Sequence, residues 1–114
     1  MSTPSARIGR SAIGITILAA FIFVNISSAS PDAGAALYKT KCVACHGADG
    51  KGATAVGKAD NIRDLGSPDV QGQSDAVLNS IITSGKDKMP AYGKSLKPEQ
   101  VTALVAYVRS LATK

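Results

Sequence analysis

One pentapeptide, Cys42-Val43-Ala44-Cys45-His46, constrains this chain of 114 residues more than any other feature. Its two cysteines stand three residues apart, and a histidine directly follows the second. C-x-x-C-H is the spacing with which a polypeptide attaches a c-type haem, because the two thiols bond to its vinyl groups while the histidine lies under the ring. The motif therefore predicts one covalent haem c, attached to Cys42 and Cys45, with His46 as an axial ligand of the iron.

Three other uses of these residues agree less well with the rest of the chain. A thioredoxin-type redox pair expects a βαβ setting, whereas the segment before Cys42 has the pattern of a helix. A closed structural zinc site needs four ligands, and the chain has only two cysteines and one histidine. A plain disulfide leaves His46 without a role.

Residues 1–29 differ in kind from the rest and are typical of a secretory signal peptide. Arg7 and Arg10 precede an apolar run over residues 12–26, and small residues follow at the positions that a signal peptidase reads. The run is about fifteen residues long, whereas a membrane-spanning helix needs about twenty. We expect cleavage after Ala29, export to the periplasm, and no stable insertion of the mature protein in a membrane. The alternative is an uncleaved anchor.

The remaining residues, 30–114, have room for one small domain. Removing Arg7 and Arg10 from the 13 basic residues leaves 11, against 8 acidic residues, so the net charge is +3. Nucleic-acid binding usually requires a much stronger basic patch, so none is predicted. A domain of this size buries too little surface to be robust without a staple. A covalently held haem can supply that staple as part of the core.

Capping signals and apolar periodicity indicate an all-α fold with three main helices. Serine, proline and aspartate at residues 30–32 are typical of a helix start. Apolar residues near the C-terminus recur at three- and four-residue steps, which predicts a helix with one buried face. No run after residue 29 alternates as a strand does. The expected segments are a helix over 31–45, a loop over 47–57, a helical turn opened by 67–69, a helix over 75–84 and a helix over 98–112.

Met89 is the candidate for the second axial ligand. His46 is the only histidine, so a second histidine of this chain cannot bind the iron, and Met89 is the only methionine after residue 29. It precedes Pro90 in a segment that proline and glycine keep out of helix. A methionine also fills apolar gaps, but histidine with methionine is a common cytochrome c pairing. We therefore expect His46 and Met89 to ligate the iron from its two sides.

Spaced residues at both ends of the domain resemble a known family. Gly34, Tyr38 and Cys42 follow one another at intervals of four, and Leu104 stands three residues before Tyr107. The Met-Pro-Ala-Tyr-Gly stretch between them is also similar to that of the family. Over essentially all of residues 30–114 the chain resembles small class I cytochromes c of the bacterial, c6-like type.

This resemblance implies a cytochrome c fold, in which the N- and C-terminal helices cross and Gly34 packs against Leu104 and Tyr107.

One departure from the family pattern concerns the second ring nitrogen of His46. Mitochondrial-type relatives hold it with the carbonyl of a proline about a dozen residues downstream, whereas this chain has no proline between His46 and Pro68. The carbonyl that would replace it is not identified by the sequence. The chain also lacks a tryptophan to bond a haem propionate.

Two protein ligands on the iron leave no vacancy for a substrate, so the sequence predicts an electron carrier rather than an enzyme. We expect it to be a monomer that docks transiently on redox partner proteins. Five lysines suggest a docking surface for these partners. Lysines are also common in any solvated loop, which is the simpler interpretation of the same residues. Two alternatives are a haem subunit of a larger dehydrogenase or oxidase, and a labile Met89 that leaves an open iron for gas sensing or peroxidase activity. The candidate docking residues are Lys41, Lys86, Lys88, Lys94 and Lys97.

Overall fold

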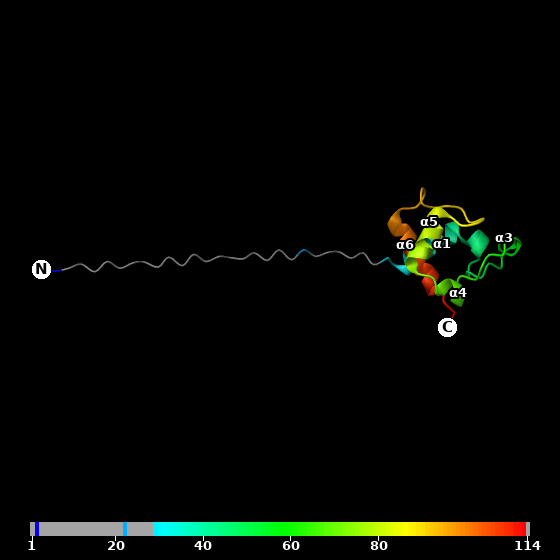
Figure 1. Cartoon of the computed structure of the whole chain (residues 1–114), viewed down its shortest axis with the longest axis horizontal. Helices are drawn as coiled ribbons and strands as arrows, with labels where there is room; N and C mark the ends of the chain where they lie inside the picture. The colour runs from blue at the N-terminus through cyan, green and yellow to red at the C-terminus, as the bar shows by residue number, and fades with distance from the viewer. Residues whose placement is uncertain (1, 3–21, 23–28, 114) are drawn as a thin grey trace.

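The computed structural model describes residues 2, 22 and 29–113, and its helices are shown in Figure 1. Within these residues no strand forms, and the only β-type pairing is an isolated bridge between Lys86 and Met89. The all-α prediction is confirmed. The signal-peptide prediction lies outside the described residues. The helices are α1 Pro31–Lys41, α2 Val43–His46, α3 Ala55–Ala59, α4 Pro68–Gln71, α5 Asp75–Ser84 and α6 Pro98–Ser110.

Among the residues that the structure describes, no helix combines the length and the apolar character needed to cross a membrane.

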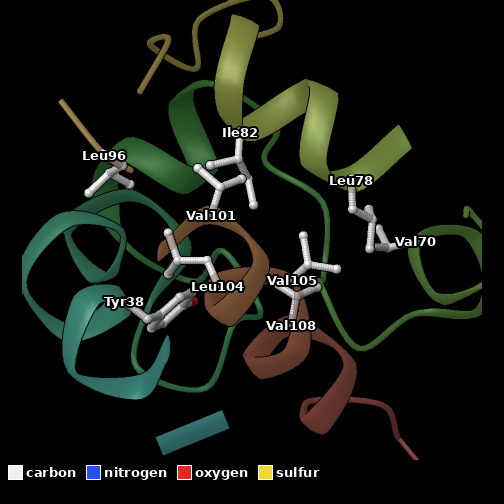
Figure 2. Close-up of a cluster of buried hydrophobic side chains, with 9 residues drawn as sticks. All are labelled: Tyr38, Val70, Leu78, Ile82, Leu96, Val101, Leu104, Val105 and Val108. Atoms are coloured by element: carbon white, nitrogen blue, oxygen red, sulfur yellow. The ribbon is translucent and has the colours of Figure 1, made fainter. Parts of the chain in front are cut away.

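α6 lies between α1 and α5, as Figure 2 shows, and its buried stripe forms the centre of the core. Tyr38 of α1 packs on one side of it, while Leu78 and Ile82 of α5 pack on the other. The apolar periodicity of the C-terminal segment therefore predicted its buried face. The core side chains are Tyr38, Val70, Leu78, Ile82, Leu96, Val101, Leu104, Val105 and Val108.

α1 and α6 approach closely because Gly34 has no side chain. A Cβ at this position would overlap the carbonyl oxygen of Ala103 and lie 2.8 Å from the Cβ of Tyr107. The rings of Tyr38 and Tyr107 pack beside this contact, with their centroids 4.8 Å apart. The expected contact of Gly34 with Tyr107 is confirmed, but the other nearest atoms belong to Ala103, whereas Leu104 is buried in the core.

The helix expected over 31–45 is interrupted at Cys42. α1 ends at Lys41, and Cys42 has φ −115° and ψ −30°, away from the usual helical φ near −63°. Its amide still donates to the carbonyl of Tyr38 at 2.9 Å, and the amide of His46 donates to the carbonyl of Cys42 at 2.9 Å. The hydrogen-bonded path thus continues through a local distortion, and α2 carries the rest of the pentapeptide.

The loop expected over 47–57 gives way to a short helix, α3, from Ala55. The Thr54 hydroxyl caps it by accepting a hydrogen bond from the Gly57 amide at 2.9 Å, and it donates to the carbonyl of Cys45 at 2.8 Å. A Cβ on Gly57 would lie 2.7 Å from the same Cys45 carbonyl oxygen. A small residue and a capping threonine therefore bring α3 directly onto α2.

Candidate functional site

One cavity brings together all four residues that the sequence predicted for the haem site. It has a volume of about 420 Å³, and Cys42, Cys45, His46 and Met89 all line it. The first three come from the region of α2, and the methionine comes from the segment between α5 and α6. Much of the remaining wall is apolar and is shared with the core, through Tyr38, Val70, Leu78, Ile82, Leu96, Leu104 and Val108.

Both cysteines of the pentapeptide carry free thiols and are half-buried at the cavity wall. The structure therefore does not contain the disulfide that was one alternative. Burial raises the pKa of the Cys42 thiol, and the positive charge of Lys41 partly opposes the rise. The described residues also contain no group of three or more histidine, cysteine or acidic side chains that could hold a metal ion by themselves.

The imidazole of His46 is half-buried, and burial lowers its pKa. Its Nδ1 atom is buried, and no group of the described chain forms a hydrogen bond with it. Such an atom is costly to bury unless the ring gains another interaction, and neutral imidazole is a common metal ligand. An imidazole that lines the cavity, and whose pKa burial lowers, therefore fits a haem iron at its other ring nitrogen, Nε2. The carbonyl that the sequence left unidentified for Nδ1 is not found among the described residues.

Met89 lies in a tight turn at the edge of the cavity. The amide of Met89 donates to the carbonyl of Lys86 at 2.8 Å, and the amide of Lys86 donates back at 3.2 Å. Gly85 and Asp87 have positive φ values of 75° and 51°, which reverse the chain direction here. The side chain of Met89 is partly buried against the core, while the residues on both sides of it are exposed. The turn thus presents a thioether to the cavity.

Two tyrosine hydroxyls hold the backbone on either side of the pentapeptide. The Tyr38 hydroxyl donates to the carbonyl of Gly47 at 2.7 Å, in a buried hydrogen bond. The Tyr92 hydroxyl donates to the carbonyl of Lys41 at 3.2 Å. Since Lys41 precedes Cys42 and Gly47 follows the histidine, each end of the haem-attachment motif is tied to another part of the fold.

The cavity also has polar residues that the sequence analysis missed, in the segment after α3. Asp60, Asn61 and Arg63 line it. Asp60 accepts a hydrogen bond from the ammonium of Lys88, with 2.6 Å between Nζ and Oδ1, and this contact raises the lysine pKa. No motif marks these residues, and Asp60 is 28 positions from its partner. These residues follow α3, and the only local sequence signal for that helix was Thr54 as a possible cap.

The five lysines proposed for docking are all exposed but do not form one equivalent set. Lys41, Lys86 and Lys88 line the cavity, whereas Lys94 and Lys97 do not. Lys88 is the only one of the five in an ion pair within the described residues. Of the three lysines that line the cavity, Lys88 therefore already has an ion-pair partner within the chain.

A comparison with protein-family models finds a match over residues 29–108 to the family described as cytochrome c oxidase, cbb3-type, subunit III. The chain is 40% identical to the cbb3-type cytochrome c oxidase subunit FixP of Bradyrhizobium sp. (strain ORS 278), over 69% of this chain and 27% of that protein. It is 42% identical to the subunit CcoP of Rubrivivax gelatinosus, over 62% and 23% respectively. The chain thus spans about a quarter of the length of these relatives.

Shorter proteins match over most of their length. Cytochrome c6 of Aphanizomenon flos-aquae is 35% identical over 66% of this chain and 83% of that protein. Among solved structures, the KustC0563 c-type cytochrome has a TM-score of 0.66 and 33% identity, and the match covers 70% of this chain and 98% of that one. With the cavity and its C-x-x-C-H motif, these matches identify the chain as a small monohaem class I c-type cytochrome with a covalently bound haem c, which belongs to the cbb3-type and c6-like cytochrome c family.

Proposed function

We propose that this chain is a periplasmic, monomeric carrier of single electrons. Its haem is bonded to Cys42 and Cys45, and His46 and Met89 are the axial ligands. The observation that carries this proposal is that all four residues, from two separate segments, line a single cavity with largely apolar walls. Residues 1–29 serve as a cleaved signal peptide and residues 30–114 form the haem domain, a division supported by the family match, which begins at residue 29.

The bound haem supplies one reversible electron, and the chain controls its surroundings. Because His46 and Met89 would both ligate the iron, no position would remain for a substrate. The soft sulfur of Met89 favours the ferrous state and raises the potential relative to ligation by two histidines. Core side chains such as Leu78 and Leu104 line the cavity and keep water from the ring. With haem bound, the chain would carry electrons without a chemical reaction of its own.

The near-infrared spectrum of the purified ferric holoprotein tests the ligation. We expect a methionine-to-iron charge-transfer band that disappears in Met89→Leu, which keeps the apolar volume but removes the sulfur. Met89→His is expected to lower the reduction potential, since it replaces the sulfur with a second histidine ligand. Absence of the band from the unmodified protein would overturn the assignment of Met89.

Carbon monoxide added to the reduced protein tests whether the site is closed. With both axial positions filled, we expect a slow and incomplete shift of the Soret band, while Met89→Leu shifts rapidly and completely. A rapid, complete shift in the unmodified protein would favour the alternative of an open iron that senses gas or acts as a peroxidase.

Docking on redox partners is proposed to depend on exposed lysines beside the cavity. Opposite charges on two proteins accelerate their encounter, and salt screens this attraction. We expect the rate of reduction by an acidic soluble partner to fall as ionic strength rises, and Lys86→Gln to reduce its salt dependence. A rate that is independent of ionic strength would count against this surface.

A second candidate is that the chain serves as a haem subunit of a larger dehydrogenase or oxidase. The match to subunit III of cbb3-type oxidases over residues 29–108 favours it. Gentle purification of the tagged protein from its native membranes and periplasm distinguishes the two. A carrier is expected to elute alone, whereas a subunit is expected to co-elute in fixed ratio with a dehydrogenase or oxidase activity. Mass spectrometry of the purified form also gives the haem count and the start of the mature chain.

A further inference from the structure

The ion pair between Lys88 and Asp60 joins two segments of the cavity wall that are far apart in sequence. Lys88 immediately precedes Met89, and Asp60 is the C-terminal cap of α3. Their side-chain atoms are 2.6 Å apart, and both residues line the cavity. The lysine side chain is 73% exposed but the aspartate only 21%. The contact therefore lies at the cavity rim, with its acidic partner largely covered.

Apart from the packing of the Met89 side chain on the core, the turn around Met89 has few other contacts that hold it. Within the described residues, no other side chain of residues 86–90 takes part in a hydrogen bond, and the two backbone bonds between Lys86 and Met89 are internal to the turn. Asp87 adopts a left-handed conformation, which is costly for a residue other than glycine. Pro90 has no amide to donate. Segments with few contacts open locally at low cost.

The hydrogen bonds of the residues after the turn attach it to other helices than α3. The amides of Tyr92 and Gly93 donate to carbonyls of Ile82 and Thr83, each at 3.0 Å. The Tyr92 hydroxyl reaches the carbonyl of Lys41. These bonds connect the segment to α5 and α1. The Lys88–Asp60 pair alone connects it to the α3 side of the cavity among the described hydrogen bonds and ion pairs.

We propose that Lys88 and Asp60 form a latch that holds the Met89 turn closed across the rim of the haem cavity. The two are positioning residues: they act on the iron through Met89 and not by touching it. The latch rests on the proposed ligation by Met89. It goes further by naming the contact that controls how often the sulfur leaves the iron. It also separates Lys88 from the docking lysines, because its charge already serves a contact within the chain.

Imidazole binding to the ferric holoprotein measures the opening, since imidazole takes the position that the sulfur leaves. Exposed ion pairs contribute little, so we expect Lys88→Gln and Asp60→Asn each to tighten apparent imidazole binding by about two- to five-fold. The double variant is expected to match either single variant, because both remove the same contact. The reversed pair, Lys88→Glu with Asp60→Lys, is expected to restore weak binding.

Lys94→Gln is the matched control, because Lys94 is also exposed and basic in the segment between α5 and α6 but forms no ion pair in the described chain. It should leave imidazole affinity unchanged. The urea midpoint of global unfolding should fall only slightly in Lys88→Gln and Asp60→Asn, because an exposed ion pair contributes little to the stability of the folded state.

Several results would overturn the latch. Unchanged imidazole affinity in Lys88→Gln and Asp60→Asn would do so, as would effects that add in the double variant or that Lys94→Gln reproduces. The charge-transfer band of the unmodified ferric protein separates this failure from that of the proposed function. If the band is present and the variants bind imidazole as the parent does, only the latch fails. If the band is absent, ligation by Met89 and the latch both fail.

Discussion

At the scale of single residues, the hydroxyl of Tyr38 has a more specific role than its apolar ring. The ring belongs to the core. The hydroxyl donates to the carbonyl of Gly47, which is itself buried and directly follows the proposed iron ligand. Spacing along a helix predicts which side is buried, but it does not predict which distant carbonyl a buried hydroxyl will reach.

Tyr38→Phe tests this hydrogen bond, since it keeps the ring and leaves the buried Gly47 carbonyl with only the Gly50 amide, at 3.1 Å, as a donor. We expect the free energy of unfolding to fall by about 1–2 kcal/mol, measured by urea denaturation. Tyr107→Phe is the control. The ring of Tyr107 packs on the ring of Tyr38, but its hydroxyl makes no hydrogen bond in the described chain. Equal losses in the two variants would show that the hydrogen bond contributes nothing of its own.

The stability that Tyr38 contributes should also depend on pH. Burial raises the pKa of its phenol, and nearby Tyr107 and Asp49 add to the rise. An unfolded tyrosine ionises near pH 10. Because the folded pKa lies above the unfolded one, the contribution is complete below about pH 10 and is lost as pH rises further. The difference in unfolding free energy between wild type and Tyr38→Phe should therefore shrink above that pH, and a constant difference would contradict this.

At the scale of helices, capping residues in the sequence predicted some helix ends correctly. α5 begins after the Ser74 cap and ends at Gly85 as expected, because the serine hydroxyl accepts from the amide of Val77 and the glycine adopts positive φ. The break at Cys42 has no proline or glycine to announce it. α3 was missed because small residues suggested a loop, although Thr54 was available as its cap.

Contacts between helices were predictable only where the family resemblance supplied them. That resemblance placed Gly34 of α1 near Tyr107 of α6, which the structure confirms. The pairs that join Lys88 to Asp60 and Tyr92 to Lys41 connect residues 28 and 51 positions apart. No periodicity or cap encodes such distances, so the sequence analysis identified the cofactor and its candidate ligands but not the contacts that position them.

Gly34→Val tests the close approach of α1 and α6. Its side chain would overlap the backbone of Ala103, so the helices must separate, and we expect a loss of about 3 kcal/mol in the free energy of unfolding. Ala36→Val, at an exposed position of the same helix, should cost less than about 1 kcal/mol, since it carries only the lower helix propensity of valine. Similar urea midpoints for the two variants would contradict the packing argument.

At the scale of the whole molecule, the core and the cavity wall are largely the same set of side chains. Seven of the nine core residues also line the cavity. The haem therefore supplies apolar contacts that a domain of this size lacks by itself. Residues such as Leu78, Ile82 and Leu104 belong to the core and also line the cavity.

Removing the haem should therefore weaken the whole fold. We expect Cys42→Ser/Cys45→Ser, produced without covalent haem, to lose much of its helical circular dichroism and to bind a hydrophobic dye. The wild-type chain produced without haem is the control, and it should behave in the same way because the cause is the missing ring and not the serines. Full helicity and a cooperative urea transition in both haem-free proteins would contradict this view of the core.

The central place of α6 also sets an order of events during synthesis. This last helix contributes four of the nine core side chains, Val101, Leu104, Val105 and Val108. A nascent chain that has reached only residue 97 lacks both the centre of its core and the surface on which α1 and α5 pack. Such a chain also lacks the α6 part of the cavity wall, including Leu104 and Val108, so Cys42–His46 stays accessible until α6 has packed.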